Sequence, residues 1–193
     1  DQNTVIISDL SKEVAITSST YEKGAIKLSL ARKQAAQALD EAIVDELAPL
    51  KMDKAQFKTV VEKLPEAEWG ATGMDRIRFE VSTNPGQPFG PLNKIASGGE
   101  LSRFLLALKV ALKKADPVPT LIFDEVDAGI GGATADAVGE RLQRLSQNVQ
   151  ILAVTHSPQV AARANDHWVI RKETHNSRAV TGASRLAPDA RQE

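Results

Sequence analysis

The chain has 193 residues, of which 42% are hydrophobic and 25% are charged, so it can form one substantial core or a compact core with an extended arm. With 24 Lys and Arg against 25 Asp and Glu, the net charge of -1 excludes a global basic field that would attract nucleic acid. The absence of cysteine excludes disulfides and thiolate metal sites. Because the sequence shows no signal peptide and no apolar run of membrane length, we expect a cytoplasmic protein without a membrane partner.

The first predicted element is a helix over residues 22–48. Apolar residues from Leu39 to Leu50 follow a helical stride, and Pro49 should end the helix. Charged residues occupy its other faces, so the pattern leaves open an ordinary amphipathic helix and the root of a coiled coil.

Two strands are expected next. Residues 53–64 fit a helix by spacing, but their β-branched run favours a strand. Residues 77–81 alternate apolar and polar side chains as a half-buried strand does, and a turn follows at 84–86. If 55–63 is also a strand, the two form a hairpin with a long connection through 70–73.

From residue 97 the pattern alternates between helices and strands, which predicts an α/β fold with a parallel or mixed sheet flanked by helices. The expected strands are 119–124, 149–155 and 167–171, and a helix is expected at 133–145. The runs at 121–123 and 151–154 are continuously apolar, so we expect those two strands to be buried on both faces.

The first candidate site is a helix start. Ser97 at the N-cap and Glu100 three residues later form a capping-box pattern. Gly98 and Gly99 lower helix propensity in the first turn, but they would let an anion approach bare N–H groups at the positive end of the helix dipole. A plain helix start is the alternative.

The second candidate site is an acidic pair, Asp124 and Glu125, at the carboxyl end of an apolar strand, where ligands of open α/β sheets gather. One carboxylate can coordinate Mg²⁺ while the next orients or deprotonates a water. A solvated acidic turn is the alternative. Asp127 and several glycines follow in a loop that leads to the next helix.

The third candidate site is His156, which follows a buried strand and precedes Ser157 as the cap of a helix that starts at Pro158. Its imidazole could bond a phosphate oxygen or an attacking water, provided the two strands are neighbours. An ordinary surface histidine is the alternative, and His167 and His175 suggest no site.

Together these sites resemble, in order, the signature motif, the Walker B motif and the switch histidine of ABC-type ATPases, a combination more specific than any of its members. Within that class the chain resembles the RecN family of SMC-like bacterial recombination proteins. The stretches that carry this resemblance are SGGELSRFLLALKVAL at 97–112, LIFDEVDAGIGG at 121–132 and VTHSPQVAA at 154–162, supported by STNPGQP at 82–88 and NKIASGGE at 93–100. It covers residues from about 45 to 172.

The resemblance implies a role for each site residue. Asp124 would hold Mg²⁺ through water, Glu125 would be the general base of ATP hydrolysis, and His156 would contact the γ-phosphate. The residues that would contact ATP on the opposite head are Ser97, Gly98, Gly99 and Glu100, and those of the D-loop that links the two sites across the interface are Asp127, Ala128 and Gly129.

The resemblance also implies the C-terminal lobe of an ABC/SMC-type ATPase head. Residues 1–50 would be a helical coiled-coil base and 51–193 the head lobe, with a strand at 55–63. The sequence has no G-x-x-x-x-G-K-[ST] phosphate loop, because 70–73 lacks the lysine and the spacing. In this family that Walker A loop lies in an N-terminal lobe, so we expect a C-terminal lobe shortened at both ends, inactive alone, without the closing helix expected after 191–193.

The function implied is repair of DNA double-strand breaks by a nucleoid-associated protein whose heads form a homodimer on ATP and separate after hydrolysis. DNA as a partner follows from the resemblance alone. Two alternatives remain: a metal-dependent nuclease or phosphatase using Asp124, Glu125 and Asp127, and a non-catalytic coiled-coil interaction module. Some basic residues on predicted helices could touch phosphates, although solvated faces explain them as well: Lys109, Lys113, Lys114, Arg141 and Arg144.

Overall fold

The computed structural model describes residues 2–92, 97–112, 118–175 and 178–187. The chain forms two compact units. The first comprises Asp1–Val44 and Ala55–Lys94, and the second comprises Asp45–Lys54 and Ile95–Glu193. No helix in the described ranges is long and apolar enough to cross a membrane.

Helix α1 (Gln2–Leu47) is longer than the sequence pattern predicted, since it starts twenty residues earlier. Its buried residues recur every four or seven positions, which places them on one face of the helix: Ala25, Ser29, Ala36, Ile43 and Leu47. The helix ends where Pro49 predicted, in the 3-10 turn η1 (Ala48–Leu50).

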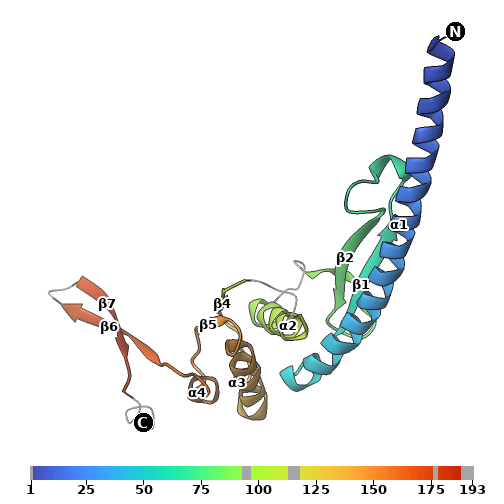
Figure 1. The fold of residues 1–193 in the computed structure, drawn as a ribbon. Coiled ribbons are helices and arrows are strands. Elements are labelled where there is room, and N and C mark those ends of the chain that lie inside the picture. Colours follow the sequence, from blue (N-terminus) through green and yellow to red (C-terminus); the bar gives the residue numbers. More distant parts are fainter. Residues whose placement is uncertain (1, 93–96, 113–117, 176–177, 188–193) are drawn as a thin grey trace. The chain divides into compact units, whose positions relative to one another are not determined.

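A hairpin completes the first unit (Figure 1). Strand β1 (Gln56–Lys63) pairs antiparallel with β2 (Asp75–Ser82), and the short β3 (Gly90–Pro91) adds to the other side of β2. The strand interpretation of 55–63 is therefore confirmed, as is the long connection, which contains the 3-10 turn η2 (Glu66–Glu68) and a bridge between Gly70 and Gly73.

Helix α1 is bonded to the hairpin at several points along its length. Ser29 and Arg32 both donate to the carboxylate of Asp75, which is almost fully buried. The backbone N–H of Thr59 donates to Asp40 at 2.9 Å. These contacts, made by both charged and backbone groups, fix the register of helix and hairpin within this unit.

The second unit alternates helices and strands as predicted. Its elements are α2 (Gly98–Ala111), β4 (Thr120–Phe123), α3 (Gly132–Ser146), β5 (Gln150–Ala153), α4 (Pro158–Ala162), β6 (Trp168–His175) and β7 (Arg178–Arg185). Strands β4 and β5 are parallel neighbours, and Phe104, Val126 and Val138 are among the fully buried residues of the core.

Two expectations about these strands were wrong. The β4–β5 sheet is not buried on both faces, because Ile122 is 70% exposed and Leu152 is 50% exposed. These residues pair across the sheet and so share one face. The third strand does not join this sheet: β6 pairs antiparallel with β7, whose carbonyl and N–H groups bond one edge of β6.

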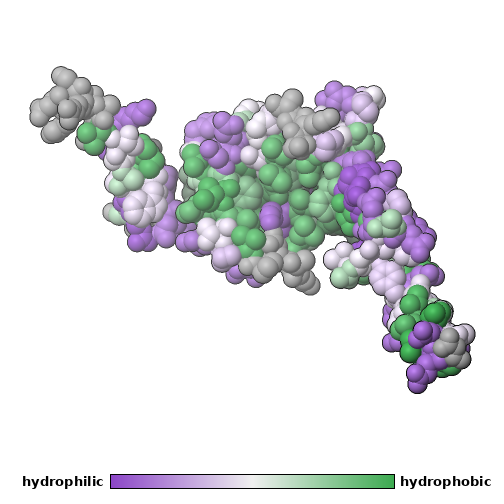
Figure 2. All heavy atoms as spheres, turned by 90° about the horizontal axis from the view of Figure 1, so that it is seen from above, coloured by the Kyte–Doolittle hydropathy of each residue, from purple (hydrophilic) through white to green (hydrophobic). Residues whose placement is uncertain are grey.

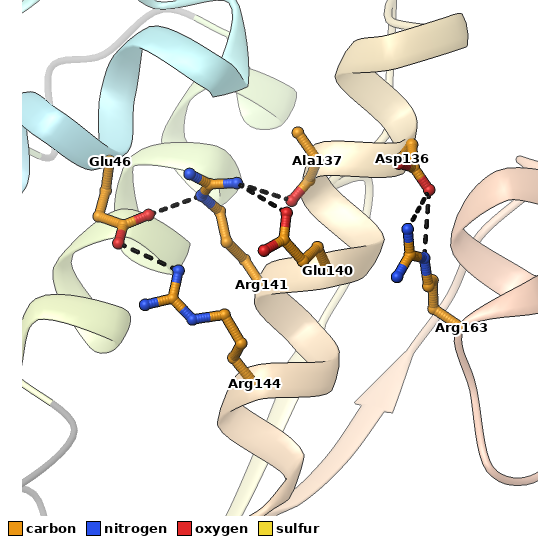
Figure 3. A network of polar contacts seen from close by, with 7 residues as sticks. All are labelled: Glu46, Asp136, Ala137, Glu140, Arg141, Arg144 and Arg163. Carbon is orange, nitrogen blue, oxygen red and sulfur yellow. Dashed lines mark hydrogen bonds and ion pairs between the residues drawn. The ribbon is translucent and has the colours of Figure 1, made fainter.

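The basic residues considered for phosphate contact have other partners or lie outside the described ranges. Arg141 on α3 is buried, and its Nε donates to Glu46 at 2.7 Å, while Arg144 reaches the same carboxylate at 3.4 Å (Figure 3). Lys113, Lys114 and residues 191–193 lie outside the described residues. The two arginines therefore stabilise the packing of α3 on the end of α1.

Candidate functional site

The start of α2 is capped as the sequence predicted. Ser97 is the N-cap residue, and its hydroxyl accepts a hydrogen bond from the N–H of Glu100 at 3.5 Å. A Cβ on Gly98 would lie 2.6 Å from Oε2 of Glu125, and one on Gly99 would lie 3.0 Å from the Cβ of Ala128. The glycines thus allow a close approach of the chain's own acidic loop, residues 124–131, to the helix start.

Two residues that the sequence analysis missed form hydrogen bonds between α2 and the acidic loop. The Ser102 hydroxyl donates to the backbone oxygen of Asp124 at 2.8 Å, and Arg103 Nη1 donates to that of Ala128 at 3.0 Å. Arg103 is buried, and this burial lowers its pKa, although the charge of Glu100 opposes the shift. The feature of the sequence that could have indicated this contact is the position of Arg103 among the apolar residues of the helix.

The acidic pair lies at the carboxyl end of β4, as predicted. Both carboxylates are exposed, and Oδ1 of Asp124 accepts from the N–H of Glu125 at 2.9 Å. Glu125 has a φ of 56°, in the left-handed region that only glycine adopts without strain. The backbone here is held in an unfavourable conformation that directs Glu125 toward the start of α2.

The parallel pairing brings His156 to the same edge. Phe123 is opposite Ala153, and the N–H of Val154 donates to the oxygen of Phe123 at 2.9 Å. The imidazole of His156 is 77% exposed. Ser157 is the N-cap residue of α4 and Pro158 is the first helical residue, as predicted, but the Ser157 hydroxyl donates to the side chain of Gln159 instead of capping the helix.

Asp127 differs from its acidic neighbours because its side chain is only 1% exposed. Its Oδ2 accepts hydrogen bonds from the Thr155 hydroxyl and from the N–H groups of His156 and Ser157, the latter two at 3.1 and 3.0 Å. Burial alone would raise the pKa of Asp127, but these bonds outweigh it and lower that pKa below its ordinary value. The sequence analysis did not predict this connection.

The donor set fits Mg²⁺ only in part. Asp124 and Glu125 present hard oxygen ligands on the surface. In the described part of the chain no three His, Cys, Asp or Glu side chains are arranged to hold a metal ion. Asp127 is turned toward residues 155–157, so a cation beside Asp124 would need further oxygens from water or from a bound phosphate.

Comparison with known proteins identifies the family. Residues 2–179 match the family model described as RecF/RecN/SMC N terminal domain, which extends the similarity to the first forty residues. The chain is 48% identical to the DNA repair protein RecN of Rickettsia bellii over 86% of this chain and 30% of that protein. It is 42% identical to RecN of Vibrio cholerae over 96% of this chain and 33% of that protein.

A solved structure shows the same fold. The Smc head domain of Pyrococcus furiosus, with an extended coiled coil and bound to the C-terminal domain of ScpA, matches with a TM-score of 0.60 at 17% identity, over 97% of this chain and 43% of that chain. The chain spans about a third of the length of the curated relatives. It belongs to the RecF/RecN/SMC family, with an SMC-head fold and close similarity to RecN.

Proposed function

We propose that this chain is the C-terminal lobe of an SMC-type ATPase head, in a protein that acts in repair of DNA double-strand breaks. The observation that carries the proposal is the convergence of the α2 start, the Asp124–Glu125 pair and His156 at one edge of the β4–β5 sheet. The names of the relatives support the repair role.

In this proposal the residues at the edge divide the work on ATP. Asp124 would hold Mg²⁺, Glu125 would accept the proton of the attacking water, and His156 would bond the γ-phosphate. Mg²⁺, when bound, neutralises charge on the phosphates. The exposure of all three side chains in the described structure is consistent with these contacts.

In the same proposal, the glycine-rich start of α2 binds the ATP of a second head. Residues 97–100 contact the ATP of the opposite head through the bare N–H groups at the end of the helix dipole, and 127–129 form the D-loop between the two sites. In the present structure the acidic loop lies close to Gly98 and Gly99. Head engagement on ATP then makes hydrolysis depend on dimerisation.

A second lobe that carries the phosphate loop fits the uncovered face of the β4–β5 sheet. Ile122, Leu152 and Val154 are exposed there, and Figure 2 colours the hydrophobic residues that reach the surface green. An exposed apolar face of this kind is typical of an interface. We propose that the N-terminal head lobe covers it and supplies the Walker A lysine, which this chain lacks.

Residues 1–50 are proposed as the base of a coiled-coil arm and 51–193 as the head lobe. Apolar residues lie exposed on the first turns of α1, among them Ile7, Leu10 and Val14, whose spacing of three and four is that of a coiled-coil seam. A second helix of the same arm would cover them.

The test is ATP turnover by this chain, alone and after addition or fusion of the phosphate-loop lobe, for the wild type and Glu125→Gln. Turnover should appear only in the reconstituted wild type, and Glu125→Gln should lower kcat at least about a hundredfold, because it removes the base but keeps the side-chain size. Glu22→Gln, an exposed change on α1, is the matched control. Unchanged turnover in Glu125→Gln would contradict the assignment.

A further inference from the structure

One carboxylate of the acidic loop, that of Asp127, is buried and hydrogen-bonded within the chain. The side chain of Asp127 is 1% exposed, whereas Asp124 and Glu125 are exposed. A buried carboxylate persists only where hydrogen bonds replace its water. Its partners therefore indicate what it does.

All of these partners come from three consecutive residues, Thr155, His156 and Ser157, which form the turn after β5. One oxygen of Asp127 accepts from the Thr155 hydroxyl, the His156 N–H and the Ser157 N–H. The Ser157 N–H also bonds the Thr155 hydroxyl at 3.0 Å. Because three donors bond one charged oxygen, the backbone of residues 155–157 is held in one conformation. His156 is therefore held at a fixed position in this turn.

The imidazole itself has little else to hold it. It is 77% exposed, and Nδ1 lies 3.6 Å from the same Asp127 oxygen. The hydrogen bonds from this turn also keep the pKa of Asp127 below its ordinary value despite burial, so the carboxylate is charged at neutral pH. The place of the imidazole is thus set mainly through the backbone of residues 155–157.

The acidic loop connects Asp127 to the edge of the β4–β5 sheet where Asp124 and Glu125 lie. Asp127 follows Asp124 and Glu125 by two or three residues, and the loop that contains all three is bonded to α2 through Ser102 and Arg103. A movement of the acidic loop would therefore move the turn after β5.

We propose that Asp127 is a positioning residue that couples the acidic loop to the 155–157 turn and so sets the place of His156 relative to Asp124 and Glu125. The inference rests on the proposed ATPase function. It assigns Asp127 a contact within its own lobe, in addition to any contact across a head interface.

The experiment uses the protein in which this chain is joined to the phosphate-loop lobe and compares Asp127→Ala, Asp127→Asn and the control Asp53→Ala, a change of an exposed aspartate in the segment before β1. We expect Asp127→Ala to lower kcat for ATP at least about tenfold with KM within about twofold, and to speed amide exchange at His156 and Ser157 at least about tenfold. Asp127→Asn should restore most of both, because its amide oxygen can accept the same N–H groups.

Either of two results would overturn the inference: unchanged amide exchange in Asp127→Ala, or a lower Tm of Asp127→Ala with a kcat like that of the Asp53→Ala control. If Asp127→Ala does not fold, Thr155→Val and Thr155→Ser decide, since only serine keeps the hydroxyl that bonds Asp127. A wild type without turnover would overturn the proposed function and the effect on His156 chemistry, while faster exchange at the turn in Asp127→Ala would still support the coupling contact.

Discussion

Two adjacent glycines at the start of α2 meet different neighbours. A Cβ on Gly98 would approach the far end of the Glu125 side chain, which can rotate away. A Cβ on Gly99 would lie 3.0 Å from the Cβ of Ala128 and 3.2 Å from its backbone oxygen. The neighbours of Gly99 belong to a loop that is bonded to α2, so they cannot move as easily.

Gly99→Ala should therefore lower the free energy of unfolding by about 1–3 kcal/mol, while Gly98→Ala should change it by no more than about 1 kcal/mol. Thermal unfolding of both variants checks this. Gly24→Ala on α1, where no atom lies within 4 Å of the added Cβ, is the control and should stabilise the helix by about 0.5–1 kcal/mol. Equal losses at Gly98 and Gly99 would contradict the close-approach argument.

Among the elements, α3 is fixed to the end of α1 by a buried ion pair. The Arg141 side chain is 8% exposed, donates to Glu46 at 2.7 Å, and also bonds the oxygen of Ala137 at 3.1 Å (Figure 3). Arg144 contacts the same glutamate, but its side chain is 43% exposed. The two arginines therefore differ in how much solvent screens them.

Arg141→Ala should cost about 2–4 kcal/mol in the free energy of unfolding, because it leaves the carboxylate of Glu46 largely buried without its main partner. Arg144→Ala should cost less than about 1 kcal/mol, as exposed pairs do. Urea unfolding measures both. In the double variant Glu46→Ala with Arg141→Ala, the loss should be smaller than the sum of the single losses, and full additivity would show that the pair does not interact.

At the scale of the whole molecule, the β4–β5 sheet has an apolar face that no described part of this chain covers. Ile122→Ser and Leu152→Ser should each change the stability of the isolated chain by less than about 1 kcal/mol, because these side chains are already exposed. The affinity of each variant for the phosphate-loop lobe should be at least about tenfold lower than that of the wild type, as measured by isothermal titration calorimetry.

The matched control is Val14→Ser, an exposed apolar change on α1. It should leave the affinity of the head lobes unaltered, because the proposed lobe interface does not include this part of α1. A tenfold loss in Val14→Ser, or none in Ile122→Ser, would show that the sheet face is not the surface that binds the phosphate-loop lobe.

The sequence by itself determined the local features of this protein. The end of α1 at Pro49, the N-cap at Ser97 and the strands that lead to Asp124 and His156 follow from propensity, capping and hydrophobic pattern, which act over a few neighbouring residues. The order of three motifs was also enough to recognise the family, which the comparisons confirm.

Only the tertiary structure decided which of these residues meet. Asp127 and the 155–157 turn are 28 to 30 positions apart, and Glu46 and Arg141 are 95 apart, so no local pattern predicts either contact. The pairing of β6 with β7 and the exposure of Ile122 were misjudged for the same reason. An apolar run shows that a strand is suited to burial, but whether a layer covers it depends on which other elements pack against it.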